Sequence, residues 1–454
     1  MPAVRENKSN KARTALRLST LAMALGLFGA GAQAQSLNEL YDAARAYDAT
    51  YLAARAQADS AQYKAAQADA LARPTLGLGA SATHQRVDPP SGGNLNSDTL
   101  QAGLKGSYAL YNRGNALTID QAQRALGVAQ ADLESAEQDL IFRVAQAYFD
   151  VLAAGDTLAT TRANKTAISE QLASAKRNFE VGTATITDTR EAQAKYDLAT
   201  AQELAADNDL RVKRVTLDQI VGRVGVEPKP LAVPVALPAL PSTNVDTWVA
   251  QADEQHPGVR KARLGLEVAQ LETQKAKAAE GVTVDLNGSL GAQNLHNNLS
   301  GLAAAQSGVG TTKNASLGVT VSFPLYTGGA TQNRIKETLK LEEKSRNDLD
   351  YARRFVSEKT KSTFFRWQSS MAQVKAYEAA ESSSKLALEA TQLGYKVGVR
   401  VNLDVLNAQT QLYSTQQNLA KARYDTVLLS LALRQAAGQL RPDDVAAVNH
   451  LLAK

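Results

Sequence analysis

The polar residues with the clearest potential for chemistry lie in two matching segments. One reads Phe-Glu-Val-Gly-Thr-Ala-Thr-Ile-Thr-Asp at 179–188, and the other reads Tyr-Lys-Val-Gly-Val-Arg-Val-Asn-Leu-Asp at 395–404. Each has a Val-Gly pair and ends on an aspartate, and the second adds Tyr395 and Arg400. These side chains can form ion pairs and hydrogen bonds. They include no nucleophile beside a base, so we expect non-covalent chemistry.

The rest of the chain offers little for catalysis or for metal binding. Cysteine is absent, and the four histidines (His84, His256, His296 and His450) lack the HxxxH or HxxH spacing of a metal site. A P-loop, a GxGxxG after a strand and a Ser/His/Asp set are also missing. We therefore predict that the protein is not an enzyme and has no cofactor.

The two matching segments belong to a larger internal duplication. They lie about 216 residues apart, and the same offset relates Tyr148-Phe149 to Phe364-Phe365 and Val221-Gly222 to Ala437-Gly438. This offset is too long for a solenoid repeat. We infer two copies of a unit of strands and long helices, and a function that depends on both copies.

The first 34 residues have the pattern of a signal peptide. Basic residues precede an apolar stretch at 21–30 that is too short to span a bilayer, and Ala32-Gln33-Ala34 matches a cleavage site. A retained anchor is the alternative. The full chain has a net charge of +5, and removal of 1–34 would leave about +1. The charge balance therefore gives no argument for a nucleic-acid partner.

Four segments alternate between apolar and polar residues, as β-strands do. Each is about ten residues long, the length of a tilted strand that crosses a hydrocarbon core. A soluble sandwich is the alternative, but the narrow apolar stripes of the helices favour strand faces that contact lipid. We predict strands at 75–83, 100–110, 282–293 and 315–325, with flexible loops at 87–98 and 294–312.

Long helices are predicted between the strand pairs. Residues from about 116 to 179 include no proline, and those from about 331 to 393 include neither proline nor glycine. Roughly 64 helical residues would span about 95 Å, which requires coiled-coil partners. The returning helices carry heptad rows that predict a packing seam in each copy. These rows are Ala194, Leu198, Ala201, Ala205, Asn208, Val212 and Val215, and then Val405, Ala408, Leu412, Thr415, Leu419, Ala422, Thr426, Leu429 and Leu433.

These patterns divide the chain into five parts. We predict a signal peptide at 1–34 and a first repeat at 35–224, with a strand pair at 75–111. A proline-rich linker with an equatorial helix follows at 225–256. A second repeat at 257–438, with a strand pair at 282–326, precedes a polar tail at 439–454. After residue 34 no apolar run approaches the length of a transmembrane helix.

In this order of elements the chain resembles the TolC-type outer-membrane efflux and type I secretion channels. The resemblance covers nearly all of 35–440, including Arg73-Pro74-Thr75-Leu76, the segment 323–329 and the turn that runs into Leu403-Asp404-Val405-Leu406. It implies an α+β membrane protein in which three chains each give four strands to a twelve-stranded β-barrel, continued into a long α-helical barrel. Closure among chains would remove open strand edges in lipid.

The resemblance also implies a function. The chain would be a passive outer-membrane exit duct of a tripartite multidrug efflux pump or a type I protein secretion system, with its helices extending through the periplasm. The implied partners are a homotrimer, a periplasmic adaptor (membrane fusion) protein, an inner-membrane transporter of the RND or ABC type, and outer-membrane lipid. The alternative is a trimeric coiled-coil surface or adhesion protein with a membrane anchor, which predicts neither the duplication nor an acid at a turn. A second alternative is a periplasmic adaptor protein, but such a protein would need a lipoyl-like β-domain.

The resemblance places a pore constriction at the periplasmic tip. It puts Asp404 in the constriction, where three copies would attract cations. Asn407 occupies the position at which the family often has a second acid, so the charge of the ring would be roughly halved. The alternative is that Asp404 only caps the helix that begins there.

The same resemblance implies a latch and a docking surface. Tyr395 and Arg400 from the second turn would meet Thr187 and Asp188 from the first, through exposed contacts worth about 0.2–1 kcal/mol each. Ordinary surface pairing is the alternative. The resemblance also implies that the tips dock an adaptor. The alternative is that the glycines of the tips only end the helices. The docking residues are Val181, Gly182, Val397 and Gly398.

Overall fold

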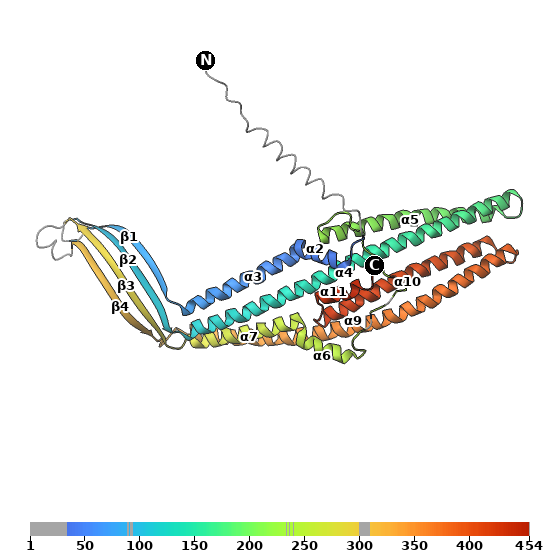
Figure 1. Ribbon diagram of the computed structural model, residues 1–454. Coiled ribbons are helices and arrows are strands. Elements are labelled where there is room, and N and C mark those ends of the chain that lie inside the picture. The colour runs from blue at the N-terminus through green and yellow to red at the C-terminus, as the bar shows by residue number, and fades with distance from the viewer. Residues whose placement is uncertain are drawn as a thin grey trace, which may run out of the picture.

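The protein is elongated, with a β-sheet at one end and two long helical hairpins at the other, in a computed structural model of the chain (Figure 1). The structure describes residues 34–88, 90, 94–232, 234–235, 237–238, 240–298 and 309–453. Apart from Ala34, the predicted signal peptide lies outside these residues.

Four antiparallel strands form one sheet in the order β1-β2-β3-β4. They are longer than the ten residues predicted, at 13 to 17 residues, because pairing continues past the apolar stretches into polar residues. The hairpin loops are correspondingly shorter, and residues 89, 91–93 and 299–308 within them lie outside the described part. The strands are β1 (Thr75–Val87), β2 (Leu95–Tyr111), β3 (Thr283–Asn297) and β4 (Gly310–Ser322).

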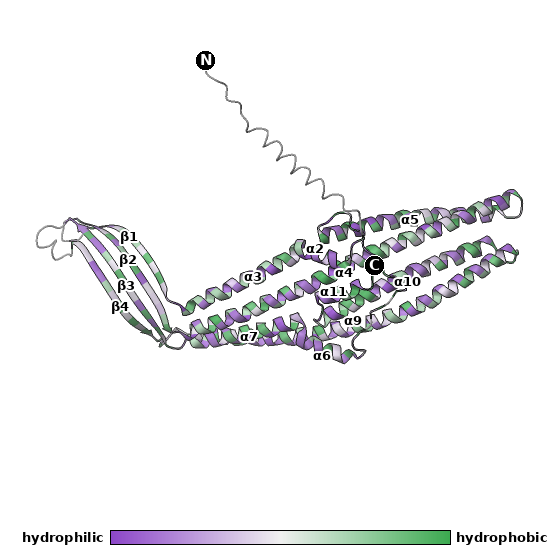
Figure 2. Ribbon diagram, in the orientation of Figure 1, coloured by the Kyte–Doolittle hydropathy of each residue, from purple (hydrophilic) through white to green (hydrophobic). Residues whose placement is uncertain are grey.

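The alternating pattern sets the register of the sheet. Leu78 lies opposite Leu104, and Leu104 lies opposite Leu290, so that apolar residues form rows across one face. The other face is polar, and the hydroxyls of Ser289 and Ser316 lie 2.8 Å apart on it. Figure 2 shows this alternation along the strands. The predicted division into an apolar and a polar face is therefore confirmed.

Long helices continue from the sheet, as predicted. The helices that follow β2 and β4 have 68 and 67 residues, and each turns back into a shorter helix. At 1.5 Å per residue, the longer one spans about 100 Å. The first repeat contains α2 (Leu37–Tyr47), α3 (Ala49–Asp69), the 3-10 helix η1 (Ala70–Ala72), α4 (Arg113–Glu180) and α5 (Ile186–Val221). The remainder contains α6 (Val245–Gln255), α7 (Pro257–Ala278), α9 (Ala330–Lys396), α10 (Asn402–Ala436) and α11 (Pro442–Asn449).

The duplication extends to a break in the helix that precedes each strand pair. An 11-residue helix ends one residue before a helix of 21 or 22 residues in both copies. The residue at the break, Asp48 or His256, caps the second helix with its side chain. The equatorial helix α6 is therefore the counterpart of α2, which favours a second repeat that begins at Val245.

Two glycines at equivalent positions allow close packing at these breaks. Gly222 follows α5 with φ of 70°, and Gly438 follows α10 with φ of 71°. A Cβ on Gly222 would lie 2.4 Å from the ring of Tyr47, and one on Gly438 would lie 2.4 Å from the Cα of His256. Only glycine combines this backbone conformation with this approach.

The elements form a strip of four in the sheet, in the helices next to the sheet and in the hairpin half. Next to the sheet, α3 packs on α4, α4 on α7, and α7 on α9. In the hairpin half, α5 packs on α4, α4 on α10, and α10 on α9. The strip therefore has one edge made of β1, α3 and α5, and another made of β4 and α9 (Figure 1).

The main hydrophobic core lies near the middle of the helices. Tyr148 and Phe149 of α4 are fully buried there, and the C-terminal segment contributes Val445, Val448 and Leu452 to the same cluster. The segment predicted as a polar tail therefore docks on the middle of the helices through its few apolar side chains.

One predicted seam is confirmed within the chain, and the residues of the other do not pack within it. On α10, Val405, Leu412 and Leu419 are buried as predicted. On α5, the predicted row is exposed in the chain, with 55% of Leu198 and 66% of Val215 accessible. Small residues instead bring α5 close to α4, and the larger apolar residues face outward from the edge of the strip. The buried α5 row is Ala192, Ala199, Ala206, Leu210 and Leu217.

Candidate functional site

The residues with predicted roles lie at the free ends of the hairpins α4–α5 and α9–α10, opposite the sheet (Figure 1). In the first turn, Gly182 follows α4 with φ of 77°. Thr185 caps α5 by accepting from the N–H of Asp188, and the Asp188 carboxylate accepts from the N–H of Thr185 at 2.9 Å. Asp188 is thus engaged in a capping box, while Thr187 is exposed.

The second turn has the same backbone and a different cap. Gly398 has φ of 82°, and the N–H of Val399 donates to the carbonyl of Gly394 at 2.9 Å. Val401 occupies the N-cap of α10 and makes no side-chain capping bond. The alternative that Asp404 caps α10 is therefore wrong. Asp404 lies within the first turn, where the helix dipole favours a carboxylate.

A hydrogen bond between Asn178 and Tyr395 joins the two hairpin ends. The side-chain amide of Asn178 donates to the hydroxyl of Tyr395 at 3.2 Å. Tyr395 thus contacts the first turn region, through a partner that the sequence analysis missed. Asn178 directly precedes the aromatic residue of its turn, and the equivalent position in the second copy is Gly394. The difference between Asn178 and Gly394 is the feature of the sequence that could have indicated this contact.

The chain does not bring together the four residues of the predicted latch. Arg400 lies beside Asp404 on its own helix, with 3.6 Å between the guanidinium and the carboxylate. Tyr395 contacts Asn178, and Asp188 caps α5. Contacts of Arg400 and Tyr395 with Thr187 and Asp188 therefore remain a prediction for neighbouring subunits.

The predicted constriction contains a cation that the sequence analysis did not identify. Asn407 lies one turn beyond Asp404 on α10, and the ammonium of Lys195 on α5 donates to its side-chain oxygen at 3.3 Å. Asn407 is exposed and the Asp404 side chain is partly exposed. Lys195 belongs to a helix that returns from the other turn, so nothing local in the sequence connects it to Asn407.

A small core holds α10 in this orientation. Leu406 is fully buried against a cluster from the first copy, which includes Ile168 and Leu172 of α4 and Ala192 and Ala199 of α5. The leucine lies between the two polar positions Asp404 and Asn407. Its burial fixes the rotation of the helix and leaves Asn407 at the surface.

Both tips carry apolar side chains in water-accessible positions. Val181 and Val397 are 72% and 66% exposed, and Val399 and Val401 are also exposed. These residues are the ones around which adaptor docking was predicted. A cluster of exposed valines at a turn favours contact with a partner.

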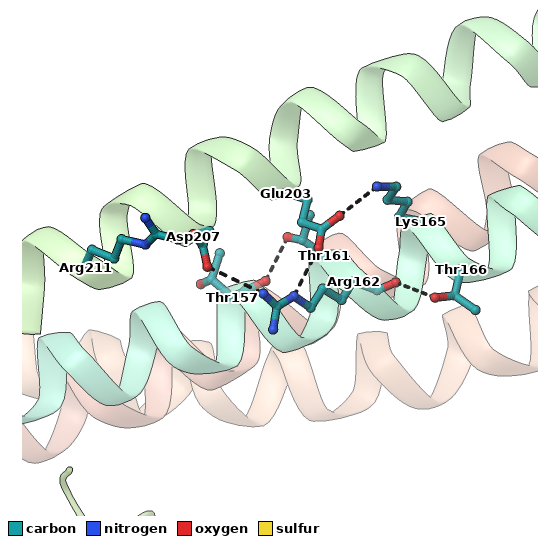
Figure 3. A network of polar contacts seen from close by, with 8 residues as sticks. All are labelled: Thr157, Thr161, Arg162, Lys165, Thr166, Glu203, Asp207 and Arg211. Carbon is teal, nitrogen blue, oxygen red and sulfur yellow. Dashed lines mark hydrogen bonds and ion pairs between the residues drawn. The ribbon is translucent and has the colours of Figure 1, made fainter.

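A ladder of ion pairs holds the two arms of the first hairpin in register (Figure 3). Arg162 of α4 lies 3.1 Å from Glu203 of α5, and Lys165 lies 2.9 Å from the same carboxylate. Arg162 also contacts Asp207, which pairs with Arg211. Hydrogen bonds from Lys165 and then from Arg162 lower the pKa of Glu203. Glu203 therefore stays ionised at neutral pH.

Within the described residues, no group of histidine, aspartate and glutamate side chains is arranged to hold a metal ion. None of the described helices combines the length and the apolar composition that a membrane crossing requires.

The chain matches a known protein family over both repeats. The family model for outer membrane efflux proteins matches residues 40–223 and 248–439. Outer membrane protein TolC of Vibrio cholerae is 33% identical over 426 residues, which cover 94% of this chain and 96% of the relative. The proteases secretion protein PrtF of Dickeya chrysanthemi is 26% identical, over 94% of this chain and 93% of that protein.

A solved structure has the same fold. The crystal structure of the outer membrane protein VceC from Vibrio cholerae superimposes with a TM-score of 0.75, over 88% of this chain and 96% of VceC. The two sequences are 21% identical. The predicted fold class, strand pairs continued into long helical hairpins in two copies, is confirmed.

Proposed function

The chain belongs to the outer membrane efflux protein family, and from this membership we infer that it is an outer-membrane exit duct for efflux and type I secretion. The helical hairpins extend into the periplasm, and the strands lie in the outer membrane. In this family the role is that of a channel.

We propose that three copies close the strip into a ring. Each copy has the same two edges in the sheet and in the helices, so that the β4 and α9 edge of one copy can meet the β1, α3 and α5 edge of the next. Such head-to-tail contacts generate rings when the rotation closes. Exposed apolar residues support this arrangement on both edges. They are Leu198, Val212 and Val215 on α5, and Tyr351, Phe355 and Phe365 on α9.

The apolar sheet face fits a lipid boundary. Leu78 and Leu317 are exposed on this face, and Tyr108, Tyr111 and Phe323 lie at the end of the band nearest the helices. An apolar band with aromatic residues at its border is typical of strands that contact a bilayer. Twelve strands from three chains would leave no open edge in lipid.

The tips are the proposed gate. Asp404 and Asn407 would line the constriction, and Tyr395, Arg400, Thr187 and Asp188 would hold it closed between neighbouring subunits. Each exposed contact is worth about 0.2–1 kcal/mol, so that a partner could separate the set without a large input of energy.

The proposed partners act at the gate. A periplasmic adaptor would bind the exposed valines at Val181 and Val397, next to Gly182 and Gly398, and would open the tips. An inner-membrane transporter of the RND or ABC type would supply the energy. The duct itself would remain passive.

The open strip, with the same two edges at every level, is the observation that carries the proposed assembly. Planar-bilayer recordings of the purified protein test it. We expect a small conductance that rises several-fold in a Tyr395→Phe, Arg400→Ser double variant. Lys344→Gln, far from the tips on α9, serves as the control and should leave the conductance unchanged. Absence of conductance in every form would overturn the duct, and equal conductance in the wild type and the double variant would overturn the latch.

A further inference from the structure

The predicted constriction brings an ion pair of the second hairpin together with a cation of the first. Asp404 is the acid of the predicted constriction, and Arg400 lies 3.6 Å from its carboxylate. The ammonium of Lys195 on α5 lies 3.3 Å from the side-chain oxygen of Asn407, one helical turn farther along α10. In each chain these contacts therefore combine one ion pair with one further cation.

Lys195 has no carboxylate partner within ion-pair distance among the described residues. The contact that the structure gives it is the neutral amide of Asn407. An ammonium that faces an amide keeps its full charge toward its surroundings, whereas Arg400 and Asp404 largely cancel each other. The uncompensated charge of this site is thus the charge of Lys195.

We propose that Lys195 determines the ion selectivity of the duct and makes its constriction prefer anions to cations. This inference rests on the proposed function, in which Asp404 and Asn407 line the constriction. Three copies would place three unpaired ammonium groups around the narrowest part of the pore. A ring of like charges concentrates ions of the opposite sign. The permeants favoured at this point would be inorganic anions and molecules with carboxylate or phosphate groups.

The geometry makes the effect large enough to measure. The Debye length is about 8 Å at physiological ionic strength, and residues one helical turn apart lie about 5–6 Å from each other. Lys195 contacts Asn407, so its charge lies at the level of the proposed constriction. We expect removal of the three charges to change the ratio of potassium to chloride permeability by roughly three- to tenfold.

Reversal potentials across planar bilayers test the inference. The purified full-length trimer is recorded in a tenfold gradient of KCl, with the wild type compared with Lys195→Gln, Lys195→Glu and Lys195→Arg. Glutamine keeps a donor for Asn407 and loses the charge, and arginine keeps both. The wild type and Lys195→Arg should prefer chloride. Lys195→Gln should shift the permeability ratio at least threefold toward potassium, and Lys195→Glu should shift it further.

The outcomes separate this inference from the proposed function. A conducting wild type that prefers potassium, or a Lys195→Gln variant with an unchanged permeability ratio, would overturn the role of Lys195 and leave the duct intact. A shift of the same size in Lys195→Arg would also overturn it, because the charge would then not be the cause. Absence of conductance in every form would overturn the duct itself.

Discussion

The hydroxyl of Tyr424 on α10 donates to the carboxylate of Asp156 on α4 at 2.6 Å, although the two residues are 268 positions apart. The tyrosine is buried, and its ring packs on Phe149 of the core. Burial, together with the hydrogen bond to Asp156, raises the pKa of Tyr424 and keeps its hydroxyl protonated as a donor. This bond links α4 of the first repeat to α10 of the second.

Replacement of Tyr424 by phenylalanine should weaken the link between the repeats. The ring and its packing remain, but the hydrogen bond from the buried hydroxyl to the exposed Asp156 carboxylate is lost, which costs about 0.5–1.5 kcal/mol. We expect a lower denaturation midpoint of the purified protein in detergent, followed by circular dichroism. Tyr413→Phe is the matched control, because the structure gives the Tyr413 hydroxyl no hydrogen bond to another described residue. Equal midpoints for the two variants would contradict the prediction.

Asp48 should make stability depend on pH in the acid range. Its carboxylate accepts two bonds from Arg143, at 2.9 and 3.1 Å, and these lower its pKa below the ordinary 3.8. A carboxyl with a lowered pKa stabilises the fold above its unfolded pKa, and this contribution is lost as pH falls through the folded value. Asp48→Asn, which keeps a capping oxygen, should cost about 1–3 kcal/mol at pH 7.

The measurement is a comparison of denaturation midpoints at pH 7 and pH 3. The difference between the wild type and Asp48→Asn should shrink at the lower pH. Asp139→Asn is the control, since Asp139 also contacts Arg143 but is half exposed, and its loss should cost less than about 1 kcal/mol. A penalty for Asp48→Asn that is the same at both pH values would argue against the ion pair.

His256 should add a second pH dependence, near neutrality. Its ring nitrogen Nδ1 accepts from the N–H of Gly258 at 3.0 Å and caps α7, and burial lowers the pKa of the ring. The folded state therefore favours neutral histidine. Its contribution is complete above the ordinary value of 6.5 and is lost as pH falls through the lowered folded value.

Asparagine at position 256 keeps a capping oxygen without titrating. We expect the melting temperature of His256→Asn to fall less than that of the wild type between pH 7 and pH 5. The melts are followed by circular dichroism, with His296→Asn on β3 as the control that retains the wild-type slope. Parallel slopes for the wild type and His256→Asn would contradict the role of the cap.

The exposed apolar row on α5 should be needed for assembly. Full burial of one such side chain contributes about 1.5–3 kcal/mol, and a charge there would also have to be desolvated. A Leu198→Glu, Val215→Glu double variant should therefore form monomers where the wild type forms trimers, as measured by light scattering in detergent. Leu198→Met, Val215→Ile should assemble normally. Trimers in the glutamate variant would exclude α5 from the interface.

Sequence reasoning identified the row that packs within the chain on α10 and missed that row on α5, for a physical reason. Both helices carry heptad rows, but α5 has two of them, one of alanines and one of larger residues such as Leu198 and Val215. A heptad row indicates that one face of a helix packs against another element, but it does not identify that element. The structure assigns the alanine row to α4 and leaves the larger row at the edge of the strip.

The sequence by itself determined the features that depend on near neighbours. These are the duplicated turns with their glycines, the alternation along the strands, and the long uninterrupted helices, since each follows from the conformations and the periodicity of a short stretch of chain. Only the tertiary structure decided which polar residues meet at the tips. Asn178 contacts Tyr395 and Lys195 contacts Asn407 across 217 and 212 positions. The second pair forms where buried Leu406 fixes the rotation of α10 against α4 and α5, and no local pattern encodes that rotation.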